Sequence, residues 1–237
     1  MSDKLTVVLV HGAFADTTAW NPVLAELARK DVDAVAVANP LRSLRGDAQY
    51  VRDVVGGLGT PVVLVGHSYG GMVITEAAGE LDGVRGLVYV AAFTPDTGES
   101  ALDLANKFAG STLGSALQSY PVTGGGNEVR IDPAKFPDQF AADLELEDAI
   151  LLGRTQRPVT EKALTDALDV EPAWKTRPTW QVYGDGDRNI PAELFRFQVE
   201  RSAPRSVREI AGASHAIAAS RPAEVAATIL EAVASTQ

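Results

Sequence analysis

The sequence contains no cysteine among its 237 residues. This absence excludes disulfide bonds, thiolate metal sites and a thiol nucleophile. Histidine occurs only three times, so chemistry that needs an imidazole must use one of three positions. No apolar run approaches the length that spans a bilayer, and residues 1–4 lead directly into an apolar strand without a signal peptide. We therefore expect a cytoplasmic protein with no membrane partner.

Positive charge is scarce relative to negative charge. The chain has 21 Lys and Arg against 31 Asp and Glu, which gives a formal net charge of −10. This balance disfavours nucleic acid or an anionic membrane as a partner. Hydrophobic residues make up 46% of the chain and charged residues 22%, as in an ordinary globular protein. The length fits one domain with a sizeable insertion, and nothing in the sequence indicates an oligomeric state.

Apolar runs rich in Val alternate with helical patterns over most of the chain. The expected strands cover residues 4–10, 33–38, 62–65, 86–92, 178–183 and 206–210. Helical patterns follow at 22–28, 46–58, 72–78, 191–199 and 222–233. We expect Ser220 to cap the last helix, with Pro222 in its first turn. The alternation predicts an α/β fold with a mostly parallel sheet of about six strands and helices on both faces.

Residues 94–169 interrupt this alternation. They contain a predicted hairpin, formed by 120–123 and 128–132, and short amphipathic helices. The helices are expected at 133–144, 146–154 and 160–168. We interpret the segment as a cap insertion on a core formed by 1–93 and 170–237. It would emerge beyond the carboxyl ends of the strands, where open parallel sheets bind ligands. The alternative is an excursion without a function.

The stretch Gly66-His67-Ser68-Tyr69-Gly70 follows the predicted strand 62–65 and precedes a helical pattern. Gly-x-Ser-x-Gly is a weak signal alone, but a strand–turn–helix context predicts a sharp, strained turn that exposes a serine nucleophile. The Ser68 hydroxyl would project above the sheet. The following helix N-terminus would favour negative charge developing there.

A serine nucleophile needs a histidine base, which is in turn oriented by a carboxylate. All three histidines follow predicted strands, at the edge where Ser68 is expected. His215 stands in an exposed-looking loop and is the candidate base. We expect His67 to serve packing with a hydrogen bond, and His11 to brace the loop that contains Gly12.

The carboxylate is expected in the loop after strand 178–183, which offers Asp185 and Asp187. The order Ser, Asp, His is the one that this architecture requires. We prefer Asp187 because it lies deeper in the loop, and we keep Asp185 as the alternative. A calcium loop would need more oxygen ligands and a closing Glu, so we expect no metal.

These segments together resemble the α/β-hydrolase superfamily, and the resemblance extends from Val7 almost to the C-terminus. The chain is similar to the compact methylesterase and hydroxynitrile lyase branch and its bacterial esterase relatives. The resemblance implies Ser68 as nucleophile, Asp187 as acid and His215 as base. It also implies an oxyanion hole formed by the backbone N–H groups of Ala13 and Tyr69. Phe14 is the alternative to Ala13 and a candidate substrate contact.

Two positions depart from the lyases of that branch, which carry Thr in place of His11 and Lys in place of Ala216. Both differences favour ester hydrolysis over cyanohydrin cleavage. We therefore expect a serine hydrolase acting on small, mainly apolar carboxylic esters, without a cofactor. Hydrolysis of lactones or carbon–carbon bonds would use the same residues. A ligand-binding receptor or pseudoenzyme on the same fold is the alternative from another class.

Several aromatic residues are candidates for the pocket wall, although aromatic residues also belong to ordinary cores. The candidates are Trp20, Phe93, Phe108, Tyr120 and Phe136. The sequence alone does not select among them.

Overall fold

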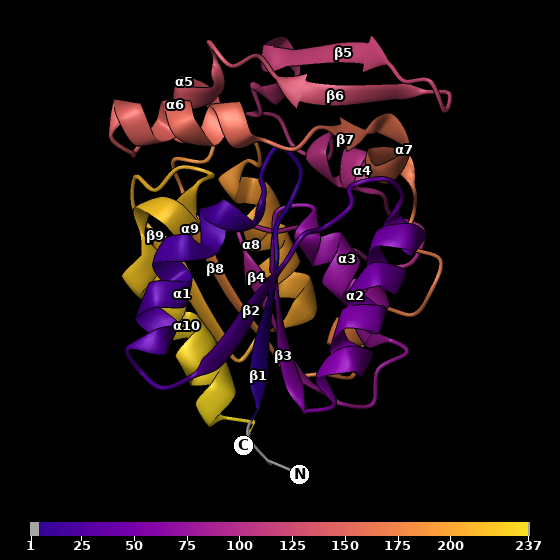
Figure 1. Cartoon of the computed structure of the whole chain (residues 1–237), viewed down its shortest axis with the longest axis vertical. Coiled ribbons are helices and arrows are strands. Elements are labelled where there is room, and N and C mark those ends of the chain that lie inside the picture. Colours follow the sequence, from indigo (N-terminus) through magenta and orange to yellow (C-terminus); the bar gives the residue numbers. More distant parts are fainter. Residues whose placement is uncertain (1–4, 237) are drawn as a thin grey trace.

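A six-stranded parallel sheet forms the centre of the molecule (Figure 1). The computed structural model describes residues 5–236, so residues 1–4, on which the absence of a signal peptide was argued, lie outside it. The strand order is β2-β1-β3-β4-β8-β9, and every pair is parallel. The strands are β1 (Thr6–Val10), β2 (Asp33–Val37), β3 (Val62–His67), β4 (Val84–Val90), β8 (Thr179–Gly184) and β9 (Ser206–Ile210). The parallel sheet expected from the alternation is confirmed.

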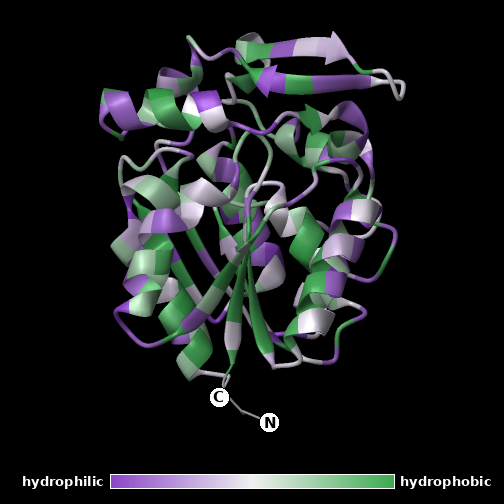
Figure 2. Cartoon of the chain, viewed as in Figure 1, coloured by the Kyte–Doolittle hydropathy of each residue, from purple (hydrophilic) through white to green (hydrophobic). Residues whose placement is uncertain are grey.

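The middle strands are buried on both faces because helices cover the sheet on each side. All six residues of β3 are buried, and its run of three valines and a leucine is the continuous apolar pattern that such a strand requires. Figure 2 shows the central strands as predominantly hydrophobic. The carboxyl end of β3 carries the Gly66–Gly70 stretch, so this core fixes the position of Ser68.

The helices divide into two layers. On one face α1 (Asn21–Ala28) packs against α10 (Pro222–Ala234), and on the other α2 (Leu44–Leu58) packs against α3 (Gly70–Ala78). Helix α8 (Ala192–Ser202) packs against β8, where Gln181 donates to Ser202 of α8 at 2.9 Å. Within residues 5–236, no helix has both the length and the apolar character needed to cross a membrane.

The insertion covers one end of the main sheet and has a small sheet of its own (Figure 1). Its antiparallel strands are β5 (Leu117–Pro121), β6 (Asn127–Ile131) and β7 (Val159–Thr160). Its helices are α4 (Ala101–Ala105), α5 (Phe136–Phe140), α6 (Leu146–Thr155) and α7 (Glu161–Thr165). We keep the name insertion for residues 94–169.

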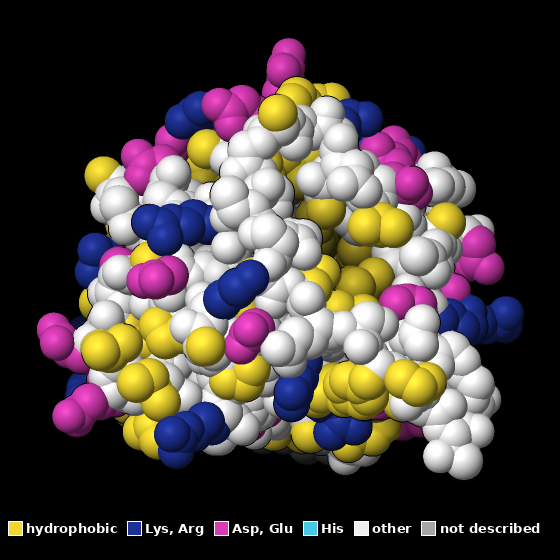
Figure 3. Space-filling view, turned by 90° about the horizontal axis from the view of Figure 1, so that it is seen from above, with side chains coloured by type: hydrophobic (Ala, Val, Ile, Leu, Met, Phe, Trp, Pro, Cys, Tyr) yellow, Lys and Arg dark blue, Asp and Glu magenta, His cyan; other side chains and the backbone are white. Residues whose placement is uncertain are grey.

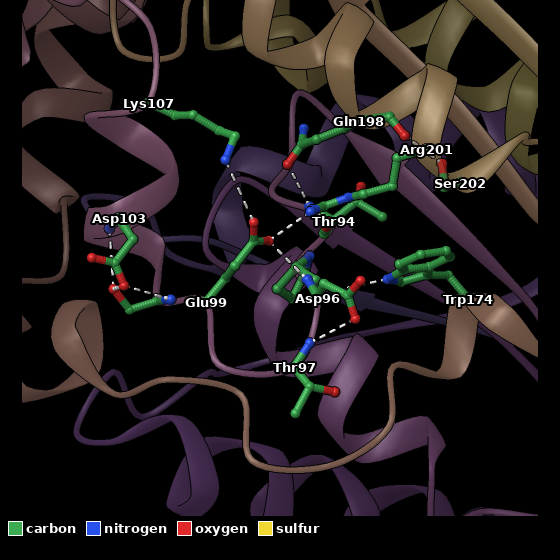
Figure 4. A network of polar contacts seen from close by, with 12 residues as sticks. Thr94, Asp96, Thr97, Glu99, Asp103, Lys107, Trp174, Gln198, Arg201 and Ser202 are labelled. Atoms are coloured by element: carbon green, nitrogen blue, oxygen red, sulfur yellow. Dashed lines mark hydrogen bonds and ion pairs between the residues drawn. The ribbon is translucent and has the colours of Figure 1, made fainter.

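The start of the insertion is tied to α8 by a polar network (Figure 4). Arg201 donates to the backbone carbonyl of Thr94 and, at 2.8 Å, to Oε2 of Glu99. The amide of Gln198 accepts from the Thr94 N–H at 2.7 Å and donates to the Ala92 carbonyl at 3.1 Å. These contacts hold both sides of Phe93, so the chain leaves the core along a defined path.

Two expectations need correction. Ser220 does not cap the last helix: it ends a separate short helix, α9 (Ile217–Ser220), and α10 begins after Arg221 without a side-chain cap. The helices expected at 133–144 and 160–168 are shorter than predicted, with five residues each in α5 and α7. Helix α4 was not anticipated, although Ser100 and Asp103 form a capping box there, which is a recognisable start signal.

Candidate active site

Ser68 lies in a tight turn between β3 and α3. Its φ angle is +54°, in the left-handed region that costs a non-glycine residue of order 1–3 kcal/mol. The turn closes so tightly that a Cβ at Gly66 would lie 2.5 Å from the carbonyl oxygen of Gly70. Glycine is therefore required for the turn, and the turn presents Ser68 at the carboxyl edge of the sheet.

His215 contacts the carboxylate of Asp187, with 2.6 Å between Nδ1 and Oδ2. Both side chains are almost fully buried. The other oxygen, Oδ1, accepts the backbone N–H groups of Asn189 at 2.7 Å and Ile190 at 2.9 Å. A carboxylate held in this way accepts from Nδ1–H and leaves the lone pair on Nε2 of His215 free for a proton.

Asp185 has a different partner. Its Oδ1 accepts the backbone N–H of Gly212 at 2.6 Å and so joins the loops that follow β8 and β9. The geometry therefore pairs His215 with Asp187, the preferred candidate, and gives Asp185 a structural contact. The catalytic role of Asp187 stays a prediction.

Ser68 and His215 line the same cavity, which has a volume of about 90 Å³. Most of its lining is aliphatic and comes from both the core and the insertion. The lining residues are Ala13, Phe14, Ser68, Tyr69, Phe93, Ala101, Leu102, Ala105, Leu113, Leu117, Leu164, Asn189, Ile190 and His215. None of these carries a charge, apart from the imidazole of His215 when it is protonated. Seen from above, Figure 3 shows a hollow with hydrophobic side chains in a surface that also carries both charge signs.

The loop after β1 lies directly against the turn at Ser68. A Cβ at Gly12 would lie 2.6 Å from the His67 carbonyl oxygen and 3.1 Å from the Tyr69 nitrogen, so only glycine allows this approach. Among residues 5–236, no acceptor pairs with the backbone N–H of Ala13 or of Tyr69. Both residues line the cavity, as does Phe14, whose φ is +60°. The Phe14 N–H also has no acceptor among these residues, so unpaired donors from both loops lie near Ser68.

The other two histidines lie outside the cavity lining. His67 is buried, and its Nε2 lies 2.9 Å from the His215 carbonyl, to which it donates. Burial, reinforced by the neighbouring His215, holds the pKa of His67 well below its usual range. Nδ1 of His11 lies 2.9 Å from the Gly12 carbonyl, and burial lowers the pKa of this ring too. These contacts match the expected packing and bracing.

Of the candidate aromatic residues, Phe93 lines the cavity. Trp20 and Phe136 border a separate small cavity beside His67. The aliphatic lining residues of α4, and Asn189, were not predicted from the sequence. The capping box at Ser100 was the available signal for α4. Asn189 gave none, because an asparagine in a loop rich in Asp and Gly indicates only a turn.

Comparison with known proteins defines the class. The chain matches the alpha/beta hydrolase family over residues 7–228, and it belongs to that family. It is 37% identical over 156 residues to a probable hydrolase, R7, from Phoma sp., an alignment covering 60% of this chain and 61% of that relative. It is 27% identical over 252 residues to the esterase PIR7B of Oryza sativa subsp. japonica, covering 94% of each.

The crystal structure of polyneuridine aldehyde esterase superimposes with a TM-score of 0.81 at 22% identity, covering 96% of this chain and 98% of the other. This likeness shows the fold. The chain therefore has the α/β-hydrolase fold, as the resemblance implied.

Proposed function

We propose that this chain is a serine hydrolase that cleaves small, mainly apolar carboxylic esters through an acyl-enzyme on Ser68. The observation that carries the proposal is the 2.6 Å contact between His215 and Asp187 in a cavity that His215 shares with Ser68. The esterase among the relatives supports the same class of reaction. The uncharged, aliphatic lining favours neutral acyl and alcohol groups, since an unpaired charge there would lose its hydration.

In the first half of the reaction, Ser68 Oγ attacks the ester carbonyl while Nε2 of His215 takes its proton. Asp187 keeps Nδ1 protonated and stabilises the imidazolium that forms. The N–H groups of Ala13 and Tyr69 would receive the oxyanion, with Phe14 as the alternative to Ala13. Their lack of another acceptor supports this role, because preorganised donors need no rearrangement as the charge develops.

The imidazolium then protonates the leaving alcohol, and the acyl group stays on Ser68. In the second half, His215 takes a proton from a water molecule, which attacks the acyl carbonyl. The bond to Ser68 Oγ then breaks, the imidazolium returns the proton to Ser68 Oγ, and the acid is released. Apart from this water molecule, the proposed mechanism uses only groups of the chain. The ring of His11 bonds Gly12 outside the cavity lining, and the lyases that the sequence resembles carry Thr at this position.

The test is turnover of a panel of chromogenic esters and lactones by the wild type and by Ser68→Ala, together with fluorophosphonate labelling. We expect one adduct, mapped to Ser68, and a loss of kcat by several orders of magnitude in Ser68→Ala. Ser235→Ala, at the exposed end of α10, is the matched control. Turnover that survives in Ser68→Ala, or a label elsewhere, would refute the proposal. A receptor or pseudoenzyme would show no turnover.

A further inference from the structure

The cavity contains a polar side chain that the proposed mechanism does not use. Asn189 is 2% exposed and lines the cavity together with Ser68 and His215. Its Nδ2 is buried, and no residue between 5 and 236 accepts a hydrogen bond from it. A buried donor without a partner loses its hydration and gains nothing in return, so it calls for an explanation.

The orientation of the Asn189 amide follows from its neighbours. Nε2 of Gln139 donates to the Arg188 carbonyl at 2.9 Å, and a carbonyl can only accept, so this end of Gln139 is its nitrogen. The same Nε2 lies 2.8 Å from Oδ1 of Asn189 and donates to it. Oε1 of Gln139 accepts from the hydroxyl of Thr112 at 2.9 Å. The oxygen of Asn189 is therefore engaged, and the unpaired end is the donor.

The contact of Asn189 with Asp187 does not explain why the side chain carries an unpaired donor. Asn189 holds that carboxylate through its backbone N–H, which any residue except proline would supply. The contact with Gln139 uses only Oδ1. The two N–H bonds of the side chain remain without a partner among residues 5–236, on a residue that lines the proposed catalytic cavity.

We propose that Asn189 is a specificity-determining residue whose Nδ2 donates a hydrogen bond to a second acceptor oxygen of the substrate. That oxygen belongs to an ether, ketone or hydroxyl group outside the scissile ester. The acceptor is neutral, because no cation lines the cavity to balance a carboxylate or phosphate. The preferred substrate is thus an oxygenated neutral ester, and a plain hydrocarbon ester leaves the donor unpaired. The inference rests on the proposed esterase function.

The test uses pairs of esters that differ by one atom. In straight-chain p-nitrophenyl and alkyl esters, each methylene in turn is replaced by an ether oxygen, on the acyl and on the alcohol side. The measured quantity is the ratio of kcat/KM for the ether ester to that for its methylene partner. Dividing the wild-type ratio by the ratio in Asn189→Leu cancels intrinsic reactivity and general damage to the site.

We expect the wild-type ratio to exceed that of Asn189→Leu by roughly tenfold at one position, as the loss of a single hydrogen bond predicts. A general loss of activity in Asn189→Leu lowers kcat/KM for both esters of a pair alike and leaves their ratio unchanged. A change of the ratio at one oxygen position is therefore not produced by a merely structural role. Asn189→Ala should lose the same preference, which guards against a packing defect of the leucine.

Asn127→Leu is the matched control, because this asparagine lies on the insertion hairpin and bonds Glu161 outside the cavity lining. It should keep the wild-type ratios. Equal ratios in the wild type and Asn189→Leu at every position would overturn the inference. If Ser68 is still labelled and Ser68→Ala is still inactive in that case, the esterase function stands and only the role of Asn189 fails.

Discussion

The hydroxyl of Tyr69 donates a hydrogen bond to Oδ2 of Asp47 over 2.9 Å, deep inside the protein. Oδ1 of the same carboxylate accepts the backbone N–H of Arg42 at 3.0 Å. Tyr69 directly follows Ser68 and supplies one of the proposed oxyanion donors. Burial, with Asp47 alongside, holds the pKa of Tyr69 well above its usual range, so the hydroxyl remains the donor. The residue beside the nucleophile is thus anchored to α2.

Removing this anchor should cost both stability and activity. Tyr69→Phe leaves the buried Asp47 carboxylate short of one donor, and we expect a loss of about 2 kcal/mol in unfolding free energy. Because the oxyanion donor becomes less well fixed, kcat should also fall several-fold. Urea denaturation and ester kinetics measure the two effects. Tyr50→Phe is the control, because Tyr50 is an exposed tyrosine of α2, the helix that carries Asp47. Equal effects of the two variants would contradict the anchoring role of Tyr69.

Substitution of the two carboxylates after β8 should lower kcat to very different extents. Asp187→Asn removes the charge that fixes the His215 tautomer and should lower kcat by roughly 10⁴-fold. Asp185→Asn should have little effect, because its amide oxygen still accepts the Gly212 N–H. The comparison needs only steady-state kinetics on one good ester. The opposite ranking would transfer the triad role to Asp185.

A buried glutamate should make stability depend on pH. Burial is the main cause that raises the pKa of Glu76 on α3 to about 7, and Asp169 adds to it. Between about pH 4.5 and 7 the folded protein keeps a proton that the unfolded chain has released, so this group costs stability as pH rises. The stability gain of Glu76→Gln over the wild type should therefore be larger at pH 8 than at pH 5. Exposed Glu147→Gln should show no such trend in the same urea titrations.

The contribution of His67 to stability should depend on pH with the sign opposite to that of Glu76. Its pKa is lowered in the folded state, so below about pH 6.5 the unfolded chain binds a proton that the folded protein excludes. The wild type should lose up to about 1.4 kcal/mol per pH unit from this group as the solution is acidified. His67→Gln keeps a donor for the His215 carbonyl but cannot titrate. Its stability relative to the wild type should rise below pH 6.5, and a constant difference down to pH 5 would count against the lowered pKa.

The sequence predicted those parts of the site that local chemistry determines. The valine run of β3 and the glycines around Ser68 specify a buried strand and a tight turn by themselves. Asp185 and Asp187 could not be separated in this way, because both occur in the same Gly-Asp repeat. The distinction depends on Gly212, which is distant in sequence and donates its backbone N–H to the Asp185 carboxylate.

The insertion was harder to predict than the core. Helix α4 has five residues, too few to form without tertiary contacts, and its periodicity is correspondingly weak. Strand β7 has two residues, and within residues 5–236 its partner strand is β6. No sequence signal marks the unpaired Nδ2 of Asn189. It results from contacts between distant segments, because Gln139 donates both to the Asn189 oxygen and to the Arg188 carbonyl. These features arise from packing between distant segments.

The insertion leaves the core after β4 and returns before β8, and these two strands pair directly, with Val90 opposite Val182. Its two ends lie side by side, because the Gly98 N–H donates to the Leu168 carbonyl at 2.7 Å and the Thr97 hydroxyl donates to the Val170 carbonyl at 2.9 Å. The proposed nucleophile, base and acid all belong to the flanking stretches, whereas Leu102, Leu113 and other aliphatic wall residues belong to the insertion. The proposed catalytic residues and Asn189 are thus encoded outside the one stretch of the gene that supplies much of the aliphatic wall. Exchange of that stretch alone would reshape most of this wall and leave the proposed catalytic residues unchanged.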